Sequence, residues 1–124
     1  YMAEYQDNAY SDPINLKALN TQFHEWDPFI APDESYIIFC SKKPGGMGRD
    51  DLYISFKNDQ DQWCSPIHLD DRFNSSESEN RPYVTNDGRF FFFTSSKRGS
   101  RDIYWVDAKI IEKINLQIPD HKIE

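Results

Sequence analysis

The sequence predicts an all-β fold of short antiparallel strands in four-stranded sheets, and three observations lead to this prediction. Aromatic residues make up 15% of the 124 residues, yet the mean hydropathy is -0.79. That combination is typical of aromatic strands joined by polar turns. Short apolar stretches are bounded by Gly, Pro, Asp and Asn, which end strands. The chain also repeats itself at a constant spacing, which indicates a repeated structural unit.

The repeat relates two segments, DPFIAPDESYIIFCSKKPG from Asp27 and RPYVTNDGRFFFFTSSKRG from Arg81. At a spacing of 54 residues, the matched pairs are Pro28 and Pro82, Asp33 and Asp87, Phe39 and Phe93, Ser41 and Ser95, Lys43 and Lys97, and Gly45 and Gly99. After a three-residue shortening, Asp51 and Tyr53 match Asp102 and Tyr104. The first residues match the end of the middle copy, with Tyr1 on Tyr53, Tyr10 on Trp63 and Ile14 on Ile67.

Each copy is expected to contain four short strands. In the complete copy these span 27–31, 35–42, 51–57 and 63–69. We therefore divide the chain into the outer strands of a preceding unit (1–19), a complete unit (20–73), the first three strands of the next unit (74–107) and a C-terminal tail (108–124).

The first turn of each copy contains residues that favour tight turns. Asp33, Asp87 and Gly88 lie there, because Asp bonds to its own backbone and Gly adopts a positive φ at no cost. Glu34 stands where the later copy has its glycine, so we expect the earlier turn to be less tight.

The second turn of each copy ends at Asp51 or Asp102. We expect each carboxylate to accept backbone N–H bonds within the turn, and cation binding by Asp50 and Asp51 is the less favoured alternative. The glycines of KPGGMGRDD lead into a strand rather than a helix. That context favours a flexible turn over a phosphate-binding loop.

Phe90 to Phe93 form a continuous aromatic run, which fits neither strand alternation nor helical spacing. A strand covered on both faces loses its alternation. We therefore expect neighbouring copies of the same sheet to cover both faces of this strand. An aromatic platform for ligand stacking is the alternative interpretation.

A family resemblance rests on the pattern P-x-x-x-x-D-G-x-x-x-x-F-x-S-x-x-x-G-x-x-D-I-Y. The residues that carry it are Pro82, Asp87, Gly88, Phe93, Ser95, Gly99, Asp102, Ile103 and Tyr104. The earlier copy carries it at Pro28, Asp33, Phe39, Ser41, Gly45, Asp51, Leu52 and Tyr53. This pattern resembles the TolB-like, WD-like β-propeller repeat, over about residues 1–107.

The resemblance implies four-stranded β-propeller blades. Because closure needs about four to eight blades, it implies an incomplete propeller of about two blades, from the C-terminal end of a longer protein. The remaining blades would come from the parent chain or from self-association. Bacterial members of such families lie in the periplasm or outside the cell, so the resemblance alone implies that placement.

The tail after Asp107 is compatible with two structures. Asp107 could cap a short helix that places Ile110, Ile111 and Ile114 on one face. The stretch 113–118, KINLQI, could instead form an outer strand. The spacing of AKIIEKI favours the helix.

The candidate ligand-binding residues precede the first strand of each copy. They are Glu25, Trp26 and Asp27 in one copy and Glu79, Asn80 and Arg81 in the next. In a propeller the first strand lines the central channel, so these residues would surround one mouth of it. The alternative is that they bond to neighbouring sheets or to water.

These residues lead us to expect a non-catalytic recognition module that binds a protein, a peptide or a glycan. One alternative is the accessory propeller of a hydrolase, such as a prolyl oligopeptidase-like peptidase. The other is a glycan-active enzyme with Glu25 and Glu79 as its carboxylate pair. No serine or cysteine stands in a recognisable nucleophile motif, so no catalytic residue is assigned.

Composition argues against several classes of protein. The net charge of -7 argues against a nucleic-acid partner, which would need a concentrated positive surface. Two cysteines and three scattered histidines predict neither a metal site nor a cofactor. Cys40 and Cys64 are expected on strands separated by a third, beyond disulfide reach. Apolar stretches are too short for a membrane span.

Overall fold

The computed structural model describes residues 1–118 and shows an all-β chain with one short helix, which confirms the predicted fold class. A hairpin consists of β1 (Tyr5–Gln6) and β2 (Ala9–Tyr10). The first sheet consists of four antiparallel strands: β3 (Glu25–Ile30), β4 (Tyr36–Ser41), β5 (Asp51–Phe56) and β6 (Ile67–His68). The second sheet consists of three: β7 (Glu79–Val84), β8 (Phe90–Ser95) and β9 (Asp102–Asp107).

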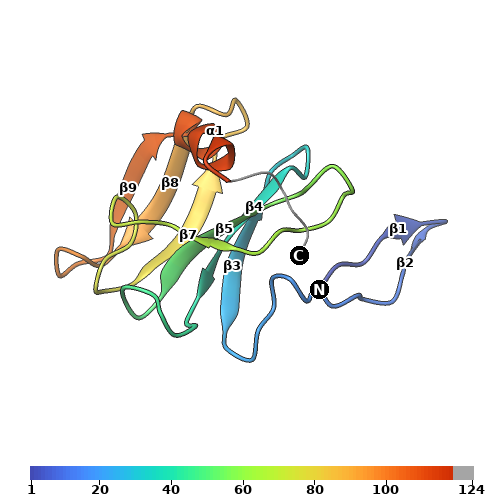
Figure 1. The fold of residues 1–124 in the computed structure, drawn as a ribbon, viewed down its shortest axis with the longest axis horizontal. Coiled ribbons are helices and arrows are strands. Elements are labelled where there is room, and N and C mark those ends of the chain that lie inside the picture. Colours follow the sequence, from blue (N-terminus) through green and yellow to red (C-terminus); the bar gives the residue numbers. More distant parts are fainter. Residues whose placement is uncertain (119–124) are drawn as a thin grey trace.

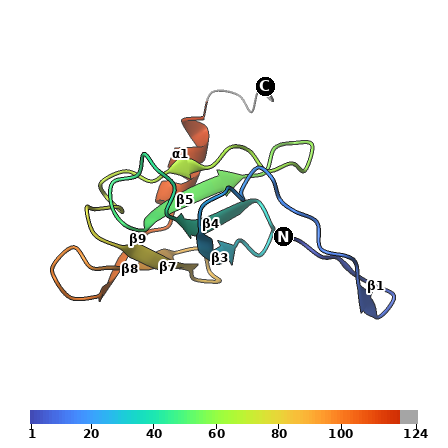
Figure 2. The same cartoon turned by 90° about the horizontal axis from the view of Figure 1, so that it is seen from below.

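The two larger sheets form adjacent layers, and the β1–β2 hairpin stands away from them (Figure 1). Figure 2 shows the same separation from below. Asp7 and Asn8 adopt positive φ angles of 52° and 62° in the hairpin turn, as two-residue hairpin turns require. A bridge between Met2 and Ile14 closes the base of the hairpin.

The second sheet repeats the hydrogen-bond register of the first. Glu25 pairs with Ser41 across β3 and β4, and Glu79 pairs with Ser95 across β7 and β8. In both sheets a β-bulge follows the second residue of the first strand. Residues related by the sequence spacing therefore occupy corresponding places, with β3, β4 and β5 matching β7, β8 and β9.

The main core lies between the two sheets. The forward face is the face that carries Ile38 in the first sheet and its counterpart Phe92 in the second. The back face is the opposite one, which carries Phe39 in the first sheet and Phe93 in the second. The forward face of the first sheet packs against the back face of the second. Full burial of a side chain such as Ile38 or Phe93 stabilises the fold by about 2 kcal/mol.

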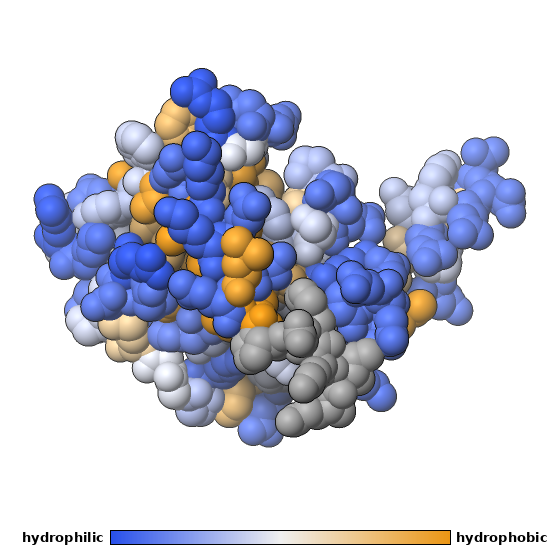
Figure 3. All heavy atoms as spheres, turned by 45° about the horizontal axis from the view of Figure 1, so that its top comes forward, coloured by the Kyte–Doolittle hydropathy of each residue, from blue (hydrophilic) through white to orange (hydrophobic). Residues whose placement is uncertain are grey.

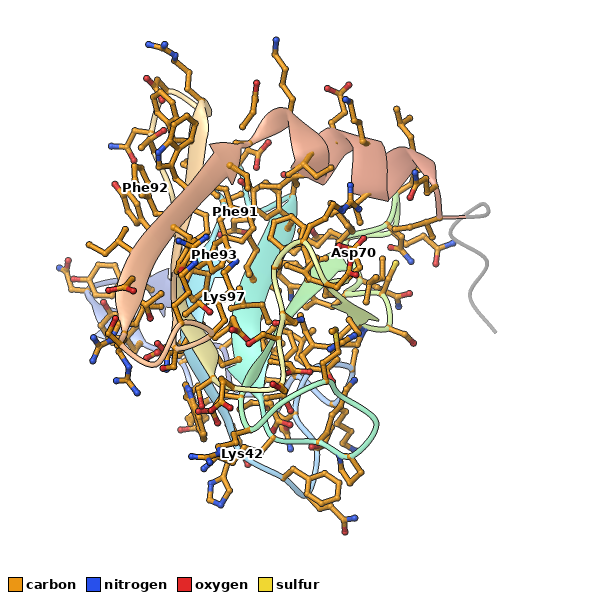
Figure 4. The ribbon with its side chains drawn as sticks, turned by 90° about the vertical axis from the view of Figure 1, so that its left-hand side faces the viewer. Lys42, Asp70, Phe91, Phe92, Phe93 and Lys97 are labelled. Carbon is orange, nitrogen blue, oxygen red and sulfur yellow. The ribbon has the colours of Figure 1, made fainter. Side chains whose placement is uncertain are left out.

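Within residues 1–118, a neighbouring sheet covers only one face of the strand at Phe90 to Phe93, so the predicted cover on its second face stays a prediction. Phe91 and Phe93 are buried in the core, whereas Phe90 and Phe92 are only half-buried on the forward face. Figure 4 shows Phe91 and Phe93 on one side of the second sheet and Phe92 on the other. No described layer covers this forward face. The strand that is buried along its whole length is β5, in the first sheet.

The fourth strand of the first sheet is shorter than the predicted range 63–69. Pairing along β5 begins with a bridge between Lys57 and Trp63 and resumes in β6. Pro66 lies between the two stretches and has no N–H to donate, which fits the interruption. Beyond β6, the buried side-chain amide of Asn74 accepts a bond from the N–H of Leu52 (2.7 Å) and donates to its carbonyl (3.0 Å).

The turn after β3 is as tight as its counterpart after β7, so the prediction of a looser turn at Glu34 is wrong. Glu34 adopts a φ of 59° and Gly88 a φ of 69°. Each donates its N–H over 2.8 Å, to the carbonyl of Ala31 and of Thr85 respectively. The glutamate therefore takes up a left-handed conformation that glycine adopts more readily.

The tail forms the helix α1 (Lys109–Leu116), and the alternative of a strand at 113–118 is wrong. The Asp107 carboxylate accepts the N–H of Lys109 (2.9 Å) at the start of the helix. Ile111 is buried, and Ile110 and Ile114 pack against the main core. Hydrophobic side chains show between hydrophilic ones over this part of the surface (Figure 3). The rest of the predicted tail, 119–124, lies outside the described residues.

Candidate functional site

The candidate site centres on the two bulges in β3 and β7, the first strands of the two sheets. Asp27 and Arg81 lie at these bulges with φ angles of 47° and 54°. Each precedes a proline, which favours an extended conformation in the residue before it. A non-glycine residue held at positive φ costs about 1–3 kcal/mol, and such residues cluster at binding sites. Both side chains are exposed.

Position within a strand distinguishes this pair from the other described non-glycine residues with positive φ. Those residues are Asp7, Asn8, Glu34 and Asp61, and all four lie between strands, where the chain turns. A bulge inside a strand redirects the side chain that it carries. The two strands also contact each other, so both bulges belong to the same part of the molecule.

Glu79, by contrast, is fully buried, and its hydrogen bonds stabilise the fold. Its carboxylate accepts bonds from the N–H of Ser75 (2.9 Å), the hydroxyl of Ser75 (2.6 Å) and the hydroxyl of Ser95 (2.5 Å). The Ser75 hydroxyl accepts the N–H of Glu77, and the Ser95 hydroxyl accepts the N–H of Lys97. We call these residues the Glu79 network. It fixes the segment before β7 to the end of β8.

Glu25 forms the corresponding Glu25 network in the first sheet. Its carboxylate accepts bonds from the N–H (3.1 Å) and hydroxyl (2.5 Å) of Thr21 and from the hydroxyl of Ser41 (3.2 Å). Glu25 is only half-buried. Its three partners correspond one for one to those of Glu79, so both carboxylates have the same structural role.

Asn80 and Trp26 have partners within the chain as well. The Thr94 hydroxyl donates to the side-chain oxygen of Asn80, which is itself buried. The ammonium group of Lys42 lies 4.8 Å from the centre of a Trp26 ring. His24 packs on the same indole with 6.2 Å between ring centres. Trp26 remains half-exposed and is the aromatic member of the site.

Cys40 lies beneath the two bulges. Burial, with a smaller contribution from the negative charge of Asp27, raises the pKa of its thiol to about 12, against the opposing effect of a bond from the backbone N–H of Arg81. Asp27 and Arg81 therefore both influence the pKa of the Cys40 thiol. Cys40 and Cys64 are not joined by a disulfide.

The predicted residues of the first turn bond within that turn. The Asp33 carboxylate accepts the N–H and hydroxyl of Ser35, and the hydroxyl bond is the main reason why its pKa is lowered. Asp87 accepts the hydroxyl of Thr85, which lowers its pKa most, and the N–H of Arg89. Gly88 supplies the positive φ described above.

The two residues of the second turn differ in their surroundings. Asp51 is buried and accepts bonds from the N–H of Met47, the N–H of Gly48 (2.9 Å) and the ring of His68 (2.6 Å). Asp102 is exposed and accepts the hydroxyl of Ser100 (2.8 Å). Gly48 lies against backbone, since an added Cβ would stand 2.1 Å from the Glu77 carbonyl. The glycine-rich turn therefore packs closely against residues 75–77, the segment that precedes β7.

A groove of about 510 Å³ runs along the back face of the first sheet. Ile30, Ile37 and Phe39 line it from the sheet, and Leu16 and Leu19 line it from the N-terminal segment. The sequence does not predict this groove. Ile37 and Phe39 alternate along β4, but they stand in the continuous apolar stretch 36–39. The sequence therefore does not separate these groove residues from their apolar neighbours.

Within residues 1–118, no group of three His, Cys, Asp or Glu side chains has an arrangement that could hold a metal ion. No helix of that same range is long and apolar enough to cross a membrane. Comparisons of the chain with protein-family models, with curated proteins and with solved structures give no significant match. The family resemblance therefore depends on the residues of this chain alone.

Proposed function

We propose that this chain is a non-catalytic recognition module, with TolB-like β-propeller blades formed by its two larger sheets. The binding surface is the exposed bulge region of β3 and β7, with Trp26, Asp27 and Arg81 as its contact residues. The observation that carries the proposal is the strained, exposed conformation of Asp27 and Arg81 at corresponding bulges. Strain that recurs in both sheets points to a requirement of function.

The chemistry of these three residues suits a protein, peptide or glycan ligand. Asp27 offers a carboxylate and Arg81 a guanidinium, so a ligand with donors and acceptors at a matching separation gains two charge-assisted hydrogen bonds. The half-exposed Trp26 ring offers a flat apolar face to a side chain or a sugar ring. In the TolB-like interpretation these residues lie at the mouth of the channel, and the protein acts in the periplasm or outside the cell.

Neither enzymatic alternative gains support from the described residues. A glycosidase needs one carboxyl group that donates a proton and another that attacks or activates water. Glu25 and Glu79 each accept three hydrogen bonds from neighbouring serine or threonine groups. The accessory propeller of a hydrolase would be a recognition module in its own right, so it does not compete with the proposed binding surface.

The proposal is tested on arrays of immobilised peptides and glycans. The double variant Asp27→Ala/Arg81→Ala is compared with wild type and with a control, Asp59→Ala/Lys109→Ala, which removes one exposed acid and one exposed base elsewhere. We expect wild type and control to bind the same array members and the double variant to lose at least tenfold in signal. Binding that survives in the double variant, or an array without any bound member, would overturn the proposal.

A further inference from the structure

The forward face of the second sheet is an apolar surface without a described covering layer. Phe90 and Phe92 lie on it, with their ring centres 6.2 Å apart, and Trp105 meets Phe90 edge-on at 5.1 Å. Trp105 is 59% exposed, Tyr83 49% and Ile103 75%. Apolar side chains gathered on one sheet face are typical of a surface that is covered by a partner.

The same positions in the first sheet are buried. Ile38 and Leu52, the counterparts of Phe92 and Ile103, are 0% exposed, and Ile54, the counterpart of Trp105, is 1% exposed. They are covered by the back face of the second sheet, which contributes Phe91 and Phe93. The chain thus contains one complete example of a forward face packed on a back face.

The groove lies on the other uncovered sheet face, which is the back face of the first sheet. In the second sheet, Phe73 and Leu69 pack beside Phe91 and Phe93, and the first sheet covers the rest of that back face. In the first sheet, the corresponding residues Leu19 and Leu16 pack beside Phe39. The remaining back face is the groove, where Ile30 is 47% exposed.

We infer that two copies of this chain associate head to tail, with the forward face of the second sheet of one copy seated in the groove of the other. The structure contains the template for this contact, because the same two kinds of face already pack together within the chain. Each copy carries one unmatched face of each kind, so the contact joins two different surfaces. Such heterologous contacts extend into rings or open chains rather than stopping at a dimer. Trp26 lines the groove as well as the bulge region, so a ligand of the bulge region would compete with this association.

The test uses one variant for each face of the full chain. Trp105→Lys places a charge on the forward face, and Ile30→Lys places one in the groove, in both cases at partly exposed positions. Leu116→Lys, at a position 78% exposed on α1, is the control for an added charge outside both faces. Ile103→Lys is a second forward-face variant, and thermal melts establish that each variant folds.

Sedimentation velocity then measures the size of each species. We expect wild type and Leu116→Lys to form oligomers larger than dimers that dissociate on dilution. Each face variant alone should be monomeric, with a loss of at least tenfold in association constant. An equimolar mixture of Trp105→Lys and Ile30→Lys should form a dimer and nothing larger, because one intact face of each kind remains.

Three results would overturn the inference. A wild-type chain that stays monomeric at high concentration shows that the two faces do not recognise each other. A face variant that still forms dimers alone shows that one surface pairs with itself. A monomeric mixture of the two folded variants shows that the two faces are not complementary.

Discussion

The hydroxyl of Ser95 donates a 2.5 Å hydrogen bond to the carboxylate of Glu79, across the paired ends of β8 and β7. Both residues are fully buried. Ser41 and Glu25 repeat this contact at 3.2 Å in the first sheet, in a more exposed setting. The same serine–glutamate hydrogen bond therefore occurs in both sheets, fully buried in the second sheet and more exposed in the first.

Substitution of the two glutamates should reveal that difference in burial. We expect Glu79→Gln to lower the free energy of unfolding by about 2 kcal/mol, because a neutral amide replaces charge-assisted bonds to buried donors. Glu25→Gln should cost less, about 0.5–1 kcal/mol, because water can reach the half-exposed donors. Urea unfolding measures both, with Glu112→Gln on the exposed side of α1 as control. Equal losses in the two variants would contradict the buried role of Glu79.

The turn at Glu34 offers a stabilising substitution. Glycine adopts the observed φ of 59° without a Cβ penalty, so Glu34→Gly should raise the free energy of unfolding by up to about 1 kcal/mol. The exposed ion pair with Lys57 (3.2 Å) opposes this gain only slightly. Gly88→Ala is the reciprocal variant and should destabilise by about 1 kcal/mol. Thermal melts that show the opposite order would contradict the left-handed turn.

Cys40 should be inert to thiol reagents in the folded protein. With a pKa of about 12 instead of 9.0, it carries about a thousandfold less thiolate at pH 8 than an unshifted thiol. We expect Cys64→Ser, which leaves Cys40 as the only thiol, to react with Ellman's reagent only after unfolding. Fast reaction of the native variant would show that the sulfur beneath the bulges is accessible.

Acid should weaken the turns of the repeat. Local hydrogen bonds lower the pKa of Asp33, mainly from the Ser35 hydroxyl, and of Asp87, mainly from the Thr85 hydroxyl. A carboxylate with a lowered folded-state pKa contributes stability that is present above its unfolded value of 3.8 and is lost as pH falls through the folded value.

Urea midpoints between pH 6 and pH 2.5 test this expectation. Asp33→Asn should show a smaller loss on acidification than wild type. A larger loss in Asp33→Asn would show that the carboxylate does not stabilise the turn.

The sequence predicted the elements of the fold well because strands and turns depend on local residues. The spacing between Pro28 and Pro82 located corresponding strands, and the isoleucines after Asp107 located the helix. The sequence did not predict burial where burial depends on a second sheet that packs against the strand. Phe92 and its counterpart Ile38 lie on the same face of their strands, and only the presence of the second sheet decides which of them is buried.

The candidate site was predicted in part for a related reason. Glu79 and Arg81 are both polar residues before or within a first strand, and sequence does not show where their partners lie. Ser75 and Ser95 engage Glu79, whereas the bulge exposes Arg81. The backbone φ values that single out Asp27 and Arg81 have no sequence signal beyond the proline that follows each of them.

Amide chemical-shift mapping, with a peptide or glycan that the array identifies, tests the proposed binding surface most directly. We predict that titration of that compound shifts the resonances around Trp26, Asp27 and Arg81 and leaves the turns at Asp33 and Asp87 unchanged. Shifts that cluster at those two turns, beyond the ends of β3 and β7, would contradict the account.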